Sequence, residues 1–260
     1  MTHDPYEKGA RFYDGAYSEK NPGDVAFYAD LAAAAGSPVL ELGCGTGRVA
    51  LPIARRRISI TGLDSSGAML SVLRGKLEAE PDEVRRRVEL VQGDMRSERL
   101  GREFSLVIIP FRPMQHMYSV EDQLGALTTA REHLAGGGLF AFDVFFPMLS
   151  RVEGGIGEEY LDSEWPAADG SGRVHRRYFR KDAYDPVDLN FSGVFLHRLC
   201  AGDEVVEEEE QPLRMSVYTY PHLKLLFAAA GLEIVEQYGT FDRQPLDADA
   251  REMIFVLKRR

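Results

Sequence analysis

The sequence predicts an α/β protein whose main domain is a doubly wound parallel sheet. Short apolar runs of strand length alternate with segments of helix length, and the first of these runs ends in a glycine-rich turn. After residue 146 the pattern changes to alternating polar and aromatic residues, which indicates antiparallel strands. We therefore expect a sheet domain at 1–146 and 214–260, with an antiparallel β insertion at 147–213.

The bulk composition is that of a globular chain with a sizeable core. Its 260 residues are 44% hydrophobic and 28% charged, and the formal net charge is −10. This charge disfavours binding to a nucleic-acid backbone or an anionic membrane. The two cysteines, Cys44 and Cys200, predict neither a metal site nor a disulfide framework. With no signal-like start and no apolar run of membrane-span length, cytoplasmic is the expected location.

The N-terminal region begins with an aromatic segment at 11–17. Phe12, Tyr13 and Tyr17 lie in a stretch too short to form its own core, so we expect it to dock on another element. Residues 24–35 then predict an amphipathic helix, with Asp24 as its N-cap and Gly36 as its stop.

The first strand, 39–42, runs into the turn Gly43-Cys44-Gly45-Thr46-Gly47. Glycines at alternate positions remove side chains from this turn, so a ligand can approach the backbone closely. The following helix points unpaired N–H groups at the turn, which suits a carboxylate, a phosphate or a polar ligand edge.

The spacing around this turn disfavours a dinucleotide and favours a nucleoside. A dinucleotide fingerprint has glycine at its sixth position, where this chain has Arg48. A second strand at 58–63 leads to Asp64, about twenty residues past the first glycine, where a carboxylate can accept the hydroxyls of a ribose.

The remaining elements of the main sheet follow in order. Ser65 or Ser66 can cap a helix to about residue 80, and a third strand at 88–92 precedes Asp94. The continuous apolar run at 104–109 predicts a central strand buried on both faces. Further expected elements are a helix at 121–135 ended by Gly136-Gly137-Gly138, a strand at 139–146, a helix at 218–230 and strands at 232–238 and 252–258.

The β insertion is expected to contain strands at 173–181, 188–199 and 204–213, joined by turns at 185–186 and 202–203. The first strand is basic and the third has four glutamates at 207–210. We expect these charges to pair across the sheet, and the alternative is a charged surface for the substrate. A free edge of the insertion makes a homodimer possible.

Three motifs together resemble the series found in class I S-adenosylmethionine-dependent methyltransferases. They are E-L-G-C-G-T-G at 41–47, G-L-D-S-S at 62–66 and Q-G-D-M at 92–95, and the similarity covers roughly 39–145. The resemblance implies a Rossmann-like seven-stranded sheet with the last strand antiparallel, and S-adenosyl-L-methionine as cofactor. It also implies that an N-terminal segment, here within 1–36, folds over the cofactor. We expect the β insertion to cover the active site.

The resemblance also implies individual cofactor contacts. The acid at the position of Asp94 accepts the adenine amino group, the N–H of Met95 meets a ring nitrogen, Met69 lies against the adenine, and Tyr13 lies near the sulfonium. The expected cofactor-binding residues are Tyr13, Glu41, Gly43, Cys44, Gly45, Arg48, Asp64, Ser65, Met69, Asp94, Met95 and Pro110.

The methyl acceptor is expected beside residues 109–116. Enzymes that methylate nucleobase amines usually have Asp or Asn where this chain has Ile109, which argues against such a substrate. His116 is the candidate base. Arg112 is a candidate for holding an anionic substrate group, or alternatively for a salt bridge to a neighbouring acid. Tyr13 is a candidate for positioning the methyl group or the acceptor.

The predicted function is methyl transfer from S-adenosylmethionine to a nitrogen or oxygen of a small-molecule acceptor, by in-line displacement. The protein's part is alignment in a dry pocket. Two alternatives stay open at this point. One is a non-catalytic protein that binds S-adenosylmethionine or S-adenosylhomocysteine, and the other is an NAD-dependent oxidoreductase.

Overall fold

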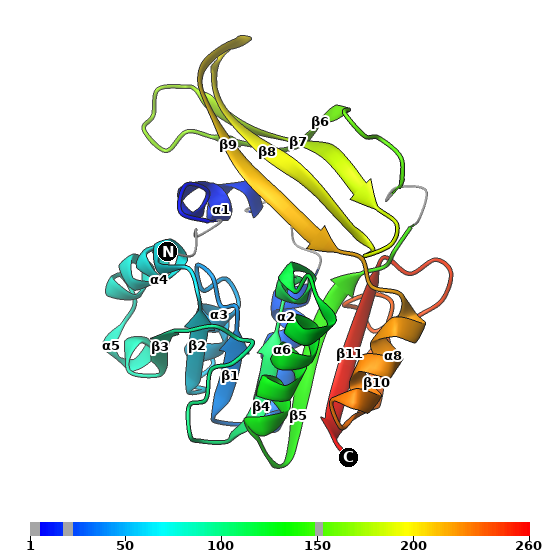
Figure 1. The fold of residues 1–260 in the computed structure, drawn as a ribbon. Helices are drawn as coiled ribbons and strands as arrows, with labels where there is room; N and C mark the ends of the chain where they lie inside the picture. Colours follow the sequence, from blue (N-terminus) through cyan, green and yellow to red (C-terminus); the bar gives the residue numbers. More distant parts are fainter. Residues whose placement is uncertain (1–5, 18–22, 149–152) are drawn as a thin grey trace. The chain divides into compact units, whose positions relative to one another are not determined.

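The computed structural model describes residues 6–17, 23–148 and 153–260, and the chain divides into two compact units (Figure 1). The larger unit draws on residues 22–146 and 218–260, and the smaller unit on residues 1–21 and 147–217. The aromatic N-terminal segment therefore groups with the β insertion.

Seven strands of the described chain form the sheet of the larger unit, in the order β10-β11-β5-β4-β1-β2-β3. Strand β11 is antiparallel to both of its neighbours, and the remaining pairs are parallel. This confirms the predicted fold class. The strands are β1 (Val39–Leu42), β2 (Ile60–Asp64), β3 (Val88–Gln92), β4 (Phe104–Ile109), β5 (Leu134–Phe145), β10 (Leu232–Tyr238) and β11 (Glu252–Arg259).

Helices cover both faces of this sheet (Figure 1). On β4, Val107 and Ile109 pack with helices α6 (Val120–Glu132) and α8 (Tyr220–Ala229). Leu106 and Ile108 pack on the opposite face with α2 (Asp24–Ala35) and α3 (Ala50–Arg55). Because β4 is buried on both faces, its sequence is apolar apart from Ser105 and does not alternate, as predicted. A small third cluster joins α3 to α4 (Gly67–Glu78), and the short α5 (Asp82–Arg85) follows.

Two predicted helix ends are wrong. Gly23, with φ +90°, occupies the N-cap position of α2, and the carboxylate of Asp24 pairs with Arg48 instead. The three glycines at 136–138 lie inside β5 and do not end the preceding helix, since α6 stops at Glu132. A register shift opposite these glycines lets β5 accommodate them beside β4. Of the two serines predicted as possible caps of α4, Ser66 is the N-cap, and its Oγ accepts the Met69 N–H at 3.1 Å.

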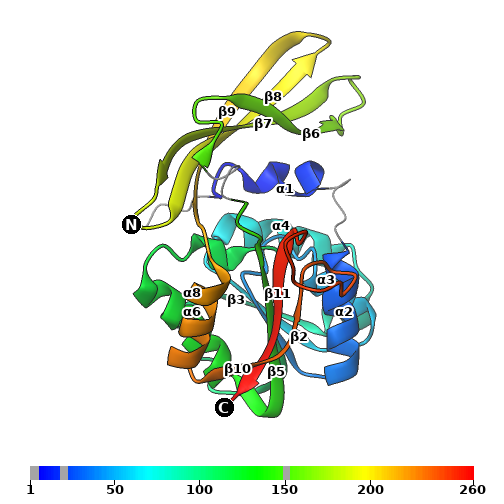
Figure 2. The same cartoon turned by 90° about the vertical axis from the view of Figure 1, so that its right-hand side faces the viewer.

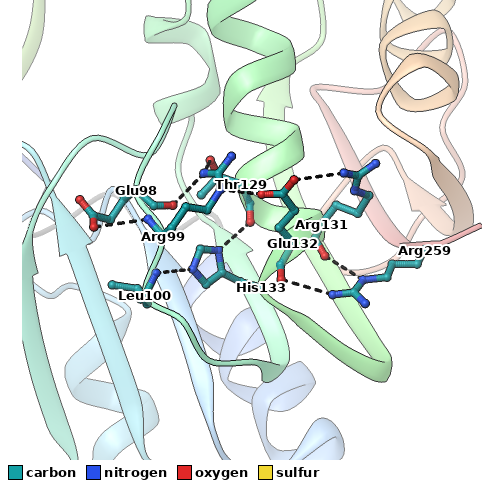
Figure 3. A network of polar contacts seen from close by, with 8 residues as sticks. All are labelled: Glu98, Arg99, Leu100, Thr129, Arg131, Glu132, His133 and Arg259. Atoms are coloured by element: carbon teal, nitrogen blue, oxygen red, sulfur yellow. Dashed lines mark hydrogen bonds and ion pairs between the residues drawn. The ribbon is translucent and has the colours of Figure 1, made fainter.

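The turn from α6 into β5 is fixed by the buried His133 (Figure 3). Its Nε2 accepts the Leu100 N–H at 2.9 Å, so its Nδ1 carries the proton and donates to the Thr129 carbonyl at 2.8 Å. Both ring nitrogens are therefore satisfied by backbone groups, and this histidine is structural.

The smaller unit is a four-stranded antiparallel sheet with the order β6-β7-β8-β9, and the described helix α1 (Ala10–Tyr17) lies along one face (Figure 2). Phe12 stacks on His197 with ring centroids 4.5 Å apart, and the Arg177 guanidinium lies 4.4 Å from the Tyr17 ring centroid. These contacts confirm that the aromatic segment docks on another element. The strands are β6 (Glu159–Pro166), β7 (Val174–Asp185), β8 (Asn190–Ala201) and β9 (Glu204–Ser216).

The predicted pairing of the basic strand with the acidic strand is wrong. Strand β8 separates β7 from β9, so their charges are not cross-strand neighbours. Arg177 of β7 pairs with Asp162 of β6, which the sequence analysis did not predict as a strand. In the acidic run, Glu208 pairs with Arg198 and Glu209 pairs with Arg11.

A pocket of about 410 Å³ lies within the smaller unit, beside α1 and strands β7–β9. Its walls include Phe12, His175, His197 and the acidic run 207–210, and it contains none of the predicted site residues. No helix among the described residues has the length and apolar character needed to cross a membrane.

Candidate functional site

The glycine turn adopts the left-handed backbone that its sequence predicts. Gly43, Gly45 and Gly47 have φ values of +76°, +53° and +78°. The N–H groups of Gly43 and Cys44 both donate to the Leu63 carbonyl, at 2.7 and 3.0 Å. These bonds fasten the turn to the end of β2.

The three glycines differ in the space around them. A Cβ on Gly43 would lie 2.9 Å from Cβ and Cγ of Pro113, and one on Gly47 would lie 2.2 Å from Cδ1 of Leu73. Both positions are therefore closed by packing. A Cβ on Gly45 would meet no atom within 4 Å, so the turn faces open space at this position.

Asp64 lies at the end of β2, directly beside this turn. Its Oδ2 accepts the Gly45 N–H at 2.7 Å, and its Oδ1 accepts the Ser66 N–H at 2.8 Å. The carboxylate is thus oriented by two backbone groups at the edge of the turn.

Glu41 is a buried carboxylate immediately before the turn, with 2% of its surface exposed. Its Oε2 has no hydrogen-bond partner among the described residues. Burial raises the pKa of Glu41 well above its ordinary value, although the nearby Arg48 opposes this shift. An unpartnered buried carboxylate oxygen is costly unless a ligand brings a cation or a donor to it.

The predicted adenine-side residues follow the second and third strands. Asp94 accepts hydrogen bonds from the backbone and guanidinium of Arg96, which hold the pKa of Asp94 below its ordinary value. The side chain of Met95 reaches the glycine turn, with Cε 3.1 Å from where a Gly43 Cβ would lie. Met69 is buried and Ser65 is exposed. Their contacts with a cofactor stay predictions.

The predicted acceptor stretch is a tight turn followed by the short 3₁₀ helix η1 (Pro113–His116). Arg112 pairs with Glu252 of β11, which is the salt-bridge alternative considered for it. Nδ1 of His116 lies 3.3 Å from the Tyr118 hydroxyl. Tyr13 belongs to α1 of the smaller unit. The catalytic roles of Tyr13, Arg112 and His116 stay predictions.

Three further residues, Asp143, Tyr28 and Glu252, were not predicted from the sequence. Asp143 of β5 is 1% exposed, and its Oδ1 accepts the Tyr28 hydroxyl at 2.6 Å and the Phe111 N–H at 2.8 Å. Burial raises the pKa of Asp143 to about 6 and the pKa of Glu252 to about 7. The sequence signals for the two acids were a single Asp within the apolar end of β5 and a Glu directly before the apolar run of β11. No group of three metal-ligating side chains gathers among the described residues.

Comparison with known proteins identifies this arrangement. Residues 39–138 match the methyltransferase domain family. The CcbJ methyltransferase of Streptomyces caelestis is similar in fold, with a TM-score of 0.78 and 28% identity over 94% of this chain and 98% of that one. Residues 39–138 are therefore a methyltransferase domain, and the protein is a methyltransferase whose cofactor is S-adenosylmethionine.

Two curated relatives are similar to this methyltransferase over most of its length. The cypemycin N-terminal methyltransferase of a Streptomyces species is 24% identical over 97% of this chain and 96% of its own. The dTDP-3-amino-3,6-dideoxy-α-D-glucopyranose N,N-dimethyltransferase of Streptomyces fradiae is 25% identical over 86% of this chain and 84% of its own.

The residues around the turn are compatible with this cofactor. Glu41 has a buried oxygen without a hydrogen-bond partner among the described residues, which suits an ammonium group, and backbone N–H groups hold the Asp64 carboxylate beside the turn. The cofactor contacts of both acids stay predictions. At Gly45, open space lies against bare backbone.

Glu252 makes the stability of this methyltransferase depend on pH. Its pKa of about 7 lies above the ordinary value of 4.5, so its contribution is complete below pH 4.5 and is lost as pH rises toward 7. Wild type should lose free energy of unfolding between pH 5 and pH 8, and Glu252→Gln should not lose this part. The difference in free energy of unfolding between the variant and wild type should therefore grow by up to about 3 kcal/mol over this range, in favour of the variant. Urea titrations at both pH values measure this, and an unchanged difference between the two proteins contradicts it.

Proposed function

We propose that this methyltransferase methylates the nitrogen of a small-molecule amine. The observation that carries the proposal is an excess of buried acid at the carboxyl ends of the strands. Among the described residues there, Asp24 pairs with Arg48 and Glu252 pairs with Arg112. The buried Asp143 accepts hydrogen bonds from two neutral groups, the Tyr28 hydroxyl and the Phe111 N–H. Oε2 of Glu252 has no hydrogen-bond partner in the described chain. Such a cluster of acids favours a cationic acceptor. An amine is cationic near neutral pH because it is protonated.

The residues of the protein align the methyl donor with the acceptor. The cofactor brings a methyl group already activated by its sulfonium. The bare turn at 43–47 and Asp64 fix the donor side, and Glu41 holds positive charge there. The turn after β4 and η1 set the acceptor side, where His116 takes the proton that an ammonium acceptor must lose before its nitrogen can attack. Holding the partners in line is worth roughly 7–11 kcal/mol in well-oriented cases.

The names of the relatives support this choice of acceptor, since one is an N-terminal methyltransferase of cypemycin and the other an N,N-dimethyltransferase of a dTDP-linked amino sugar. A catalytic role for Tyr13 is part of the same proposal. The net charge of −10 supports a small molecule over nucleic acid. A cytoplasmic location and a homodimer through the β insertion belong to the same proposal.

The test uses an acceptor panel with methyl-labelled S-adenosylmethionine. The panel pairs dTDP-3-amino-3,6-dideoxy-α-D-glucopyranose with its 3-hydroxy analogue, and a peptide bearing a free N-terminus with its N-acetylated form. We expect label only in an amine member of a pair. Label in the hydroxy analogue alone, or in neither member of either pair while the cofactor binds, contradicts the proposed amine acceptor.

A further inference from the structure

The turn after β4 holds a backbone conformation that requires external support. Phe111 and Arg112 are consecutive non-glycine residues with φ values of +63° and +74°. Each left-handed residue of this kind costs on the order of 1 kcal/mol or more. The Phe111 N–H donates to Oδ1 of the buried Asp143 at 2.8 Å, so a β5 side chain holds the turn at its strained residue.

Asp143 is itself oriented by helix α2. The Tyr28 hydroxyl donates to the same oxygen, Oδ1, at 2.6 Å, and both side chains are almost fully buried. One turn earlier on the same face of α2, Asp24 pairs with Arg48, which follows the glycine turn directly. The helix therefore contacts both the acid that holds the turn and the arginine beside the glycines.

Arg48 closes these contacts into a cycle of five residues. Its guanidinium lies 4.2 Å from the centroid of the Phe111 ring, a cation–π geometry. The contact cycle consists of Asp24, Arg48, Phe111, Asp143 and Tyr28. Each of its members contacts the next, and the α2 backbone joins the last to the first.

The contact cycle also fixes the position of Pro113 over the glycine turn. Pro113 follows the strained residues directly, and a Cβ on Gly43 would lie 2.9 Å from its ring carbons. The turn is held on β5 by the bond from Phe111 to Asp143, and the η1 helix that follows it is held there by Gln115, whose Oε1 accepts the Phe145 N–H at 3.2 Å. Movement of Phe111 would therefore move Pro113 relative to Gly43.

We propose that Asp143 is a positioning residue that couples the glycine turn to the turn after β4. Its Oδ1 holds Phe111 in place, and through Arg48 and Pro113 the two turns adopt one joint conformation. This inference rests on the proposed function in one respect, namely that the cofactor occupies the first turn and the acceptor lies beside the second.

Amide hydrogen exchange of residues 110–118 tests the coupling, with S-adenosylhomocysteine as the ligand. In the wild type, saturating ligand should slow exchange in this segment about 10-fold. We expect Asp143→Ala to raise ligand-free exchange at Phe111 about 10-fold or more and to abolish the slowing by ligand, with the dissociation constant changed by less than about 3-fold. Asp143→Asn retains the acceptor oxygen and should restore both readings. Asp30→Ala on the exposed face of α2 is the matched control and should behave as wild type.

Unchanged exchange in Asp143→Ala would overturn the inference, and so would Asp143→Asn exchanging as fast as Asp143→Ala. If Asp143→Ala does not fold, Tyr28→Phe replaces it, with Tyr238→Phe as control. We expect about 3-fold faster exchange in Tyr28→Phe alone, and equal rates in both variants contradict the inference. If the wild type fails to bind S-adenosylhomocysteine, the assumed cofactor site fails, while the ligand-free rates still decide whether Asp143 holds the turn.

Discussion

Gly43→Ala is expected to weaken the binding of S-adenosylhomocysteine by about 100-fold. Alanine at φ +76° costs roughly 1 kcal/mol, and its Cβ would press against the rigid ring of Pro113 at 2.9 Å. Either the glycine turn or η1 must shift, and both border the expected cofactor site. Isothermal titration calorimetry measures the change in affinity.

The matched control for this variant is Gly101→Ala. Gly101 has a similar φ of +68°, but a Cβ there would meet no atom within 4 Å. This variant carries the backbone strain without the collision, so its affinity should equal that of wild type. Equal affinities in Gly43→Ala and wild type would mean that Pro113 does not restrain the glycine turn.

Glu41→Gln is expected to change stability and cofactor affinity in opposite directions. Removing an unpartnered buried charge should raise the free energy of unfolding by about 1–3 kcal/mol. Losing a charged partner for the cofactor's ammonium group should weaken binding by about 10- to 100-fold. Urea unfolding and calorimetry on the same preparation measure both effects.

Glu89→Gln serves as the control for Glu41→Gln. Glu89 lies on β3, about half of its side chain is exposed, and it pairs with Arg102 at the surface. Its replacement should change neither quantity appreciably. A Glu41→Gln protein that is less stable than wild type and binds the cofactor equally well would show that Glu41 is structural.

Most of the larger unit was predictable because its signals are local. Val39, Leu40 and Leu42 lead into glycines whose left-handed φ no other residue adopts readily, and Asp64 follows the next strand at a fixed spacing. The apolar run at 104–109 has no alternation because helices cover both faces. Each of these features is encoded by a few consecutive residues.

The errors arise where a local signal has a second meaning. Gly136, Gly137 and Gly138 read as a helix stop, but a register shift between β4 and β5 places them inside a strand. Strand β6 was missed because Glu159–Pro166 is largely polar and ends in proline, as an edge strand can. The order of the smaller sheet, which separates the basic and acidic strands, is not encoded in either strand alone.

The partners of the site residues were beyond prediction because they are distant in sequence. Arg112 pairs with Glu252 across 140 positions, and Tyr28 donates to Asp143 across 115. A single acid within an apolar strand carries no signal for which backbone group it will hold. The resemblance to known methyltransferases provided the cofactor, but no motif covered Asp143 or Glu252.

A crystal structure of the complex with S-adenosylhomocysteine would show directly whether the cofactor binds at the glycine turn. We predict the ligand against the backbone of 43–47, its ribose hydroxyls on Asp64 and its ammonium group on Glu41. Density for the ligand elsewhere on the chain, or no density at saturating concentration, would contradict the assignment of this site.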